Sequence, residues 1–346
     1  MHKRRSCIKI LSIFFGAASL SLVVSVLAPV ISAKKYAAKM AFRLGSDGNA
    51  FSNISFRTND SHGRKVTLTS DRVSENKKDN FIFENTTLTF TMANGENGRI
   101  CADVTRTARA DRTVCELVGN VELKTDGGLL IKTAQSLVDF DKKIVVGATN
   151  IVISKKELKA SSRKYSFDMN RNILRLNDNA RGSVGTDQVT ANEMVIHFDN
   201  MNEKSAKYIE AIGDASYVSA AYDLKADGAI KFHGDRISAD NRVALFYKRN
   251  GKDYLVKSDH MRATLDKKGT VNNVEAIGSL IIKAKDATIR AENGVFSNEK
   301  IVARGNVVIS SRHGDVFGDV AVLDINTGNV TMDNFSGVVA DGRRNQ

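Results

Sequence analysis

The stretch ELVGNVELKTDGGLLIKTAQSLVDFDKKIVVGATNIVIS, residues 116–154, decides the fold because its apolar and polar residues alternate with a period of two. This period is typical of β-strands that bury one face. Turn-forming clusters such as TDGG at 125–128 separate the apolar runs. The same pattern recurs beyond residue 40 with almost no 3.6-residue period, so the sequence predicts an all-β fold.

Two themes alternate along this pattern. In the first, a strand passes through a glycine or small residue, as in LVGNVEL at 117–123, VVGATNIVI at 145–153, AIGDASYV at 211–218, AIGSLIIK at 276–283 and ARGNVVIS at 303–310. In the second, apolar residues follow a small residue by five and seven positions, as from Ala239 to Ala244 and Phe246. Residues two apart on a strand share a face. Repetition of these themes predicts stacked strands in a jelly roll, with two sheets facing each other like a V.

Composition and charge argue against several functional classes. The 346 residues carry a net charge of +12, and subtracting the four basic residues ahead of residue 10 leaves +8 for residues 34–346. No block of five or more Lys or Arg occurs, so the concentrated basic patch of a nucleic-acid-binding protein is missing and no nucleic-acid partner is expected. An anionic glycolipid or a membrane surface suits this dispersed positive charge better.

The N-terminal segment predicts export. Residues 10–33 contain no charged residue and follow the basic residues 1–9. Their length is sufficient to cross a bilayer, which favours a single transmembrane anchor with residues 1–9 in the cytoplasm. A signal peptide cleaved before Lys34 is the alternative. Both interpretations place the rest of the chain outside the cytoplasm.

Export also places Cys101 and Cys115 in an oxidising compartment, where disulfides form. If a hairpin turns near Ala108, the two cysteines are equidistant from the turn and lie opposite each other. The sequence therefore predicts a possible disulfide. The alternative is that both are small buried hydrophobic residues.

Several quoted patterns resemble a known family. The stretch 116–154, together with VTLTSDRVSENKKDNFIFENTTLTFTMANGENGRICAD at 66–103 and LKASSRKYSFDMNRNILRLNDNARGSV at 158–184, resembles the LptC family of lipopolysaccharide-export proteins. Patterns further on, such as VTANEMVIHFD at 189–199 and IRAENGVFSNEKIVARGNVVIS at 289–310, are similar to LptA and to OstA-like domains. With RGSVGTDQ at 181–188 as the boundary, we expect an LptC-like domain at 34–184 and an LptA/OstA-like domain at 185–346.

The resemblance implies that the anchor lies in the inner membrane of a Gram-negative bacterium, with the bulk of the chain in the periplasm. It also implies that a β-jellyroll groove receives the acyl chains of lipid A. It also implies the partners: the inner-membrane lipopolysaccharide ABC transporter on one side, and an LptA-like bridge protein or the N-terminal domain of the outer-membrane translocon on the other. The apolar residues that we expect to line the groove are Val121, Leu123, Phe140, Phe167, Phe198, Phe246, Leu265 and Phe296. For each one, a plain core contact is the alternative, since alternating strands bury one face in any case.

Strand edges are the expected contacts with the partners, because an edge offers unpaired backbone donors and acceptors. We expect the strand at 66–73 to meet the transporter and the strand at 320–330 to meet the next bridge component.

No enzyme motif is present. The six histidines are scattered singly, without the spacing of a zinc site, and there is no P-loop, GxSxG or GxGxxG pattern. We therefore expect no catalytic residue, metal or cofactor. A carbohydrate-active enzyme with two carboxylates and a structural or adhesive β-protein remain as alternatives.

Overall fold

The computed structural model describes residues 50–59, 65–75, 80–91, 97–108, 114–139, 142, 144–155, 158–168, 171, 173–198, 206–220, 222–249, 252–265, 271–284, 287–297 and 299–339. These residues form 24 β-strands and no helix, which confirms the all-β class. They divide into two compact units. The N-terminal unit contains the described residues up to Ser183 together with Glu193–Lys207, and the C-terminal unit contains Val184–Asn192 and the described residues from Tyr208 onward.

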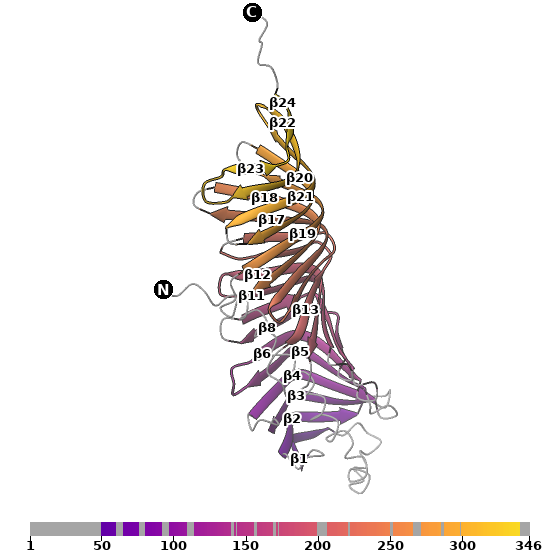
Figure 1. Ribbon diagram of the computed structural model, residues 1–346. Coiled ribbons are helices and arrows are strands. Elements are labelled where there is room, and N and C mark those ends of the chain that lie inside the picture. Colours follow the sequence, from indigo (N-terminus) through magenta and orange to yellow (C-terminus); the bar gives the residue numbers. More distant parts are fainter. Residues whose placement is uncertain are drawn as a thin grey trace, which may run out of the picture. The chain divides into compact units, whose positions relative to one another are not determined.

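Antiparallel pairs join consecutive strands of the N-terminal unit from β1 to β6 (Figure 1). Beyond β6 the strands are broken in two: β6 pairs with β7 and β8, β7 pairs with β10, and β8 pairs with β9. β11 pairs with β10 and β9. The first eleven strands are β1 (Phe51–Asn59), β2 (Lys65–Glu75), β3 (Asn80–Thr91), β4 (Asn97–Ala108), β5 (Val114–Thr125), β6 (Leu130–Asp139), β7 (Ile144–Gly147), β8 (Ile151–Lys155), β9 (Leu158–Ser162), β10 (Lys164–Asp168) and β11 (Ile173–Val184).

The C-terminal unit repeats this arrangement. Consecutive strands pair from β17 to β22, and broken strands flank them: β15 and β16 pair with β17, and β23 and β24 pair with β22. The remaining strands are β12 (Asp187–Phe198), β13 (Ala206–Ile212), β14 (Ala215–Val218), β15 (Tyr222–Ala226), β16 (Ala229–His233), β17 (Arg236–Arg249), β18 (Lys252–Leu265), β19 (Val271–Lys283), β20 (Ala287–Ser297), β21 (Lys300–Ser311), β22 (Gly314–Asp324), β23 (Val330–Asp333) and β24 (Ser336–Val339).

Many strands have a corner near the middle, where two consecutive residues adopt positive φ. These pairs are Gly119–Asn120, Asp178–Asn179, Gly213–Asp214, Asn241–Arg242, Gly278–Ser279 and Gly305–Asn306. Glycine, Asn and Asp tolerate this conformation best, which explains why the glycine theme recurs in the sequence. Register shifts coincide with the corners of β5, β19 and β21, and such bulges bend a strand.

The small-residue theme marks a second kind of bend. Ser258 is buried, and its hydroxyl donates to the carbonyl oxygen of His260, two residues on, at 2.8 Å. Ser162 makes the same contact with Lys164 O at 2.8 Å. The register of β18 shifts at this point. The buried hydroxyl thus satisfies a backbone carbonyl that the bend would otherwise leave without a donor.

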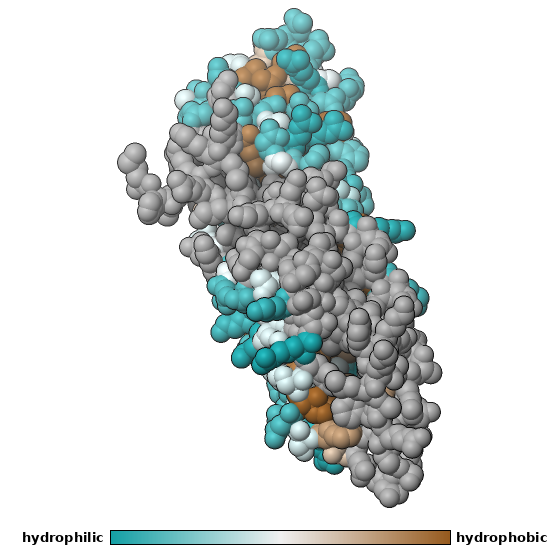
Figure 2. All heavy atoms as spheres, turned by 90° about the horizontal axis from the view of Figure 1, so that it is seen from below, coloured by the Kyte–Doolittle hydropathy of each residue, from teal (hydrophilic) through white to brown (hydrophobic). Residues whose placement is uncertain are grey.

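Each bend divides a strand into two arms, and both arms bury alternate side chains. In β19, Val274 and Ala276 are buried before the corner, and Leu280 and Ile282 after it. The arms therefore form two layers within each unit, with the hydrophobic core between them. Figure 2 shows the complementary outside: hydrophilic residues predominate among the coloured atoms of that face, and hydrophobic ones form small groups.

The predicted disulfide is wrong. Cys101 and Cys115 are both free. Thr107 pairs with Cys115, so the hairpin is centred near residue 111 instead of 108, and Cys101 lies opposite Glu122. The separation of six positions from Cys101 to Thr107 corresponds to roughly 20 Å along a strand. Cys115 is buried, as the alternative interpretation expected.

Predictions for residues 1–9 and 10–33 lie outside the described residues. Within the described part of the chain, no helix is both long and apolar enough to span a bilayer. The two domain assignments stay predictions.

Candidate functional site

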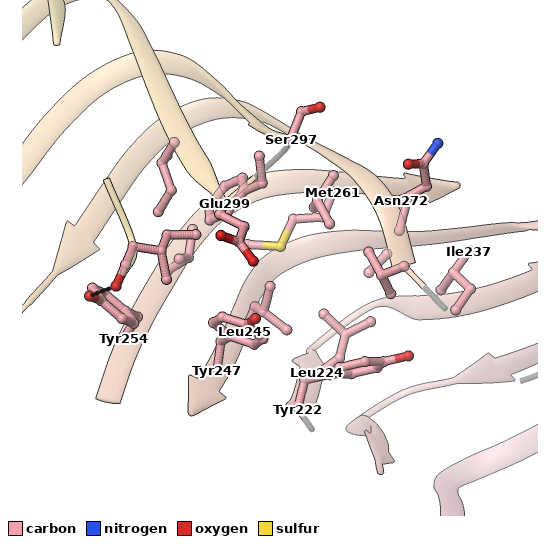
Figure 3. Close-up of a pocket in the computed structure, with 18 residues that line it drawn as sticks. Tyr222, Leu224, Ile237, Leu245, Tyr247, Tyr254, Met261, Asn272, Ser297 and Glu299 are labelled. Carbon is pink, nitrogen blue, oxygen red and sulfur yellow. Dashed lines mark hydrogen bonds between the residues drawn. The ribbon is translucent and has the colours of Figure 1, made fainter. Parts of the chain in front are cut away.

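An apolar cavity of about 380 Å³ lies inside the C-terminal unit (Figure 3). Pockets that bind small molecules typically have volumes of about 300 to 1,000 Å³. The cavity is lined by Tyr222, Leu224, Ile237, Ala239, Leu245, Tyr247, Tyr254, Val256, Met261, Ala263, Val271, Asn272, Val274, Phe296, Ser297, Glu299, Ile301 and Ile325.

Two layers of bent strands form the walls of the cavity. The tyrosine layer consists of β15 and the arms at 243–249, 252–258, 280–283, 287–291, 307–311 and 314–318. The opposite layer consists of the arms at 236–240, 260–265, 271–277, 293–297, 300–304 and 320–324. The cavity therefore lies between the two layers. Elsewhere in the unit, core side chains fill the space between them.

Small side chains on the opposite layer help to keep this space open. Ala239 and Ala263 line the cavity, and the lining residues two positions before them are the larger Ile237 and Met261. Close-packed interiors leave a void where facing side chains do not interdigitate. Ala239 is the leading small residue of the theme in the sequence, which therefore limits how far the opposite layer reaches inward at this position.

A hydrogen bond links the two layers beside the cavity. The hydroxyl of Tyr254 on β18 donates to the carbonyl oxygen of Ile325, beyond β22, at 2.8 Å. Tyr254 is buried. Its burial, followed by the negative charge of Asp324, raises the pKa of the tyrosine hydroxyl. The hydroxyl therefore keeps its proton and remains a donor at neutral pH.

The polar lining is confined to a few groups, among which Glu299 is the one charged residue of the eighteen. Glu299 has a φ of 65°, its backbone carbonyl accepts from Ile325 N at 2.9 Å, and its carboxylate accepts from the Asn326 amide. Backbone N–H donation from Thr327 lowers the pKa of the nearby Asp324 carboxyl. Figure 3 shows Glu299 among the lining side chains, near Met261.

This chemistry suits an apolar ligand. A mostly hydrophobic lining with a few polar groups binds apolar molecules and fixes their orientation. Within the described residues no cluster of three His, Cys, Asp or Glu side chains is arranged to hold a metal ion.

Of the eight predicted groove residues, Phe296 lines the cavity. Val121, Leu123, Phe167 and Leu265 are buried in the core without lining it. Phe140 lies outside the described residues, and so does the side chain of Phe198.

The predicted inward direction of Phe246 is wrong. Phe246 lies on the outer face and is 44% exposed, whereas Leu245 and Tyr247 face the cavity. The corner of β17 contains two left-handed residues, Asn241 and Arg242. Because side chains alternate along a strand, the extra corner residue shifts the inward positions by one.

Sequence reasoning also missed the tyrosines of the cavity. Tyr247 and Tyr254 are direct partners across the β17–β18 hairpin. The signal was present, since the two residues stand symmetrically in the sequence about the Asn250–Gly251 pair within RNGKD at 249–253. A hairpin register built from that turn would have paired them.

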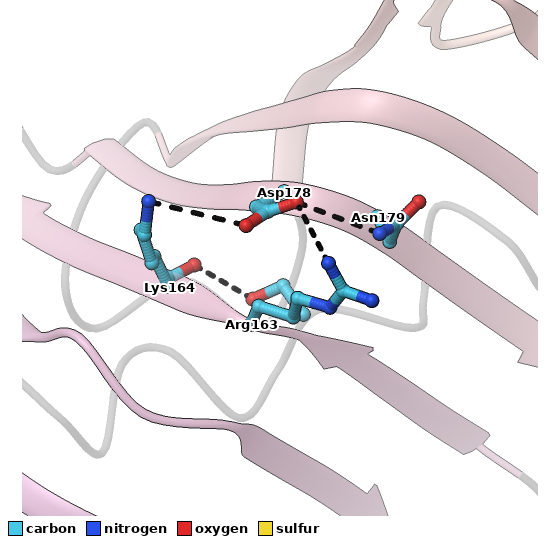
Figure 4. A network of polar contacts seen from close by, with 5 residues as sticks. Arg163, Lys164, Asp178 and Asn179 are labelled. Carbon is cyan, nitrogen blue, oxygen red and sulfur yellow. Dashed lines mark hydrogen bonds and ion pairs between the residues drawn. The ribbon is translucent and has the colours of Figure 1, made fainter.

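A polar cluster in the N-terminal unit supports a corner (Figure 4). The Asp178 carboxylate lies 3.7 Å from the Arg163 guanidinium and 3.9 Å from the Lys164 ammonium, and Arg163 N donates to Asp178 O at 3.0 Å. Asn179 Nδ2 lies 3.5 Å from the same carboxylate. These side chains are substantially exposed, which fits stabilisation of the corner at Asp178–Asn179.

Residues 49–185 match the family described as lipopolysaccharide-assembly, LptC-related. The match confirms the resemblance of this region to the LptC family.

Among solved structures, the chain is similar to LptH, the LptA homologous periplasmic component of the conserved lipopolysaccharide transport device from Pseudomonas aeruginosa. The TM-score is 0.28 and the identity 10%, over 44% of this chain and 94% of LptH. No curated protein matches the chain. The predicted similarity of residues 185–346 to LptA and OstA-like domains stays a prediction.

Proposed function

We propose that this chain is a non-enzymatic lipopolysaccharide-transport protein whose cavity accepts acyl chains of lipid A. Its LptC-related residues 49–185 support the transport class. The observation that carries the acyl-chain assignment is the apolar cavity between the two layers of the C-terminal unit.

The physical reason is the cost of moving lipid through water. Each methylene exposed to water costs about 0.8 kcal/mol, so a carrier needs an apolar surface that replaces the membrane. A cavity lined by aliphatic and aromatic side chains supplies such a surface, and the tyrosine hydroxyls, Asn272 and Glu299 provide polar contacts.

The proposal includes a location and partners. Residues 10–33 anchor the chain in the inner membrane, and the two units stand in the periplasm. The chain receives lipopolysaccharide from the inner-membrane ABC transporter and passes it to an LptA-like bridge protein or to the N-terminal domain of the outer-membrane translocon.

At each end of the described chain, the edge strand is the neighbour of the strand that the sequence predicted. β1 pairs with β2, so 66–73 is covered and β1 is the terminal strand of the N-terminal unit. β23 and β24 pair with β22, so they, and not 320–324, form the terminal strand of the C-terminal unit. We assign the transporter contact to β1 and the bridge contact to β23 and β24.

Photocrosslinking tests the acyl-chain site. Phe296 faces the cavity, and Val295, its neighbour on β20, is exposed on the outer face. With a benzophenone amino acid in place of each, irradiation of cells should give a lipopolysaccharide adduct at position 296 and little at 295. No adduct at 296, or equal adducts at both positions, would contradict the proposal.

Truncation tests the bridge contact. Removal of residues 330–346 eliminates β23 and β24, and we expect loss of capture of the LptA-like partner in a pull-down. Removal of residues 340–346 alone is the matched control and should leave capture intact. Undiminished capture by the longer truncation would reject the assignment of β23 and β24.

A further inference from the structure

A row of seven side chains, three of them basic and four apolar, crosses the outer face of the tyrosine layer, on the side away from the cavity; we call it the basic row. Its members are direct cross-strand partners on consecutive strands from β15 through β17 to β22. The row is Lys225, Ala244, Lys257, Ile281, Arg290, Val308 and Phe317. Val256 and Ile282, the sequence neighbours of Lys257 and Ile281, are buried in the core, so the row itself faces outward.

The spacing of the cations is regular. Lys225, Lys257 and Arg290 are separated by two strands each, and neighbouring strands lie about 4.8 Å apart, so the cations repeat roughly every 10 Å. The side chains of all three residues are exposed. None of the seven members is acidic. Asp223 lies 3.3 Å from Lys225 and partly neutralises it, so Lys257 and Arg290 supply most of the positive potential.

The outer face of the opposite layer has a different charge pattern. There, Lys231 lies 2.9 Å from Glu210, and Arg262 is the direct partner of Glu275. Opposite charges facing each other on neighbouring strands neutralise one another. The basic row thus distinguishes one outer face of the C-terminal unit from the other.

Exposed aromatic rings accompany the basic row. Phe317 ends the row and is 42% exposed, and Phe246, exposed on the same face, lies with its ring 5.6 Å from the Lys225 ammonium. Cations that alternate with apolar residues beside exposed rings suit a surface that is both anionic and partly apolar. A bilayer of anionic phospholipids has these properties at its headgroup level.

We infer that the outer face of the tyrosine layer binds the surface of an anionic phospholipid bilayer through Lys225, Lys257 and Arg290. The choice of a bilayer over a soluble polyanion rests on the membrane anchor at 10–33 in the proposed function. The inference is independent of the acyl-chain proposal, because the cavity lies on the inner side of the same strands.

A single tryptophan tests this inference, because the chain contains none of its own. The full-length F246W protein is reconstituted in nanodiscs of phosphatidylcholine alone or mixed with phosphatidylglycerol, both containing brominated lipid. We expect stronger bromine quenching of the new tryptophan in the anionic discs, and loss of the difference at high salt. In the K225Q/K257Q/R290Q variant, the ratio of membrane-bound to free protein face should fall about fivefold for each cation removed.

Matched changes on the opposite outer face serve as controls. K231Q/R262Q/R304Q alters the net charge equally and should leave the quenching of F246W intact, and a V295W reporter should be quenched weakly. Equal quenching in both kinds of disc, equal loss in both triple variants, or equal quenching of V295W would overturn the inference. If the first triple variant loses its β-sheet circular dichroism, K257Q/R290Q replaces it with the same expectation.

Discussion

The two units bend their strands alike but fill the space between their layers differently. In the N-terminal unit, aromatic rings lie against glycines of the neighbouring strand: Phe90 against Gly98, and Tyr165 against Gly147. In the C-terminal unit, the direct partner of Gly294 is Ala276, and the side chain that lies against this glycine is the aliphatic Leu280. The same architecture thus gives tight ring-to-glycine packing in one unit and a cavity of about 380 Å³ in the other.

The largest expected difference between the units concerns two phenylalanines. Phe167 is fully buried in the N-terminal unit, whereas Phe296 lines the cavity and is half-buried. F167A should destabilise its unit by about 3 to 5 kcal/mol, because it removes contacts on all sides and leaves a void. F296A should cost about 1 kcal/mol, because it enlarges an existing cavity and removes less buried area.

Hydrogen exchange of the full-length protein measures the opening free energy of each unit separately. A cost for F296A as large as that for F167A would mean that the cavity wall is packed like the core, and the comparison between the units would fail.

Two glycines give the next largest effect. A Cβ at Gly147 would collide with the buried ring of Tyr165, whose hydroxyl donates to Gln135 O at 3.4 Å. G147A should therefore destabilise the N-terminal unit by about 1 to 3 kcal/mol. A Cβ at Gly294 would lie 2.5 Å from the terminal Leu280 Cδ2, which can turn aside, so G294A should cost about 1 kcal/mol or less. Thermal unfolding of both variants tests the order, and a larger loss for G294A would reverse the interpretation.

The sequence predicted the common architecture of the units better than their differences. Period-two alternation predicted the strands, and the repeated themes predicted stacked strands in two facing sheets. The structure adds the reason for the glycine theme, because left-handed corners need residues such as Gly119 and Gly278. The direction of Phe246 depended on one extra residue at a corner, and the partner of Cys115 depended on a turn centred three residues beyond the predicted position. Alternation determines neither. The cavity was harder still, since it arises where Ala239 and Tyr247, on different layers, fail to fill the space between them.

The core of the N-terminal unit predicts a response to alkaline pH. Burial, assisted by the negative charge of Glu116, raises the pKa of Cys115 from 9.0 to about 12. Below pH 9 the thiol is protonated whether the chain is folded or not, and its contribution to stability is complete. Above pH 9 the unfolded chain loses the proton first, so stability falls as the pH rises towards 12, by about 1.4 kcal/mol between pH 8 and pH 10.

The variant C115A isolates this contribution. Between pH 8 and pH 10 the unfolding free energy of its N-terminal unit should fall less than that of the unchanged protein. Tyr165, whose pKa is also raised by burial, contributes equally in both chains and cancels. Identical slopes would show that the Cys115 thiol ionises as readily in the fold as in the unfolded chain.

The smallest expected effect concerns the hydrogen bond that joins the two layers of the C-terminal unit. Tyr254 spans them by donating to Ile325 O at 2.8 Å, and Y254F leaves that carbonyl without this donor at a cost of about 1 kcal/mol. Hydrogen exchange should accelerate around Ile325 and β18 and stay unchanged in the N-terminal unit. Lipopolysaccharide crosslinking from position 296 should persist, because the wall around Phe296 is intact; its loss would mean that the hydrogen bond, and not the apolar lining, determines whether the cavity accepts an acyl chain.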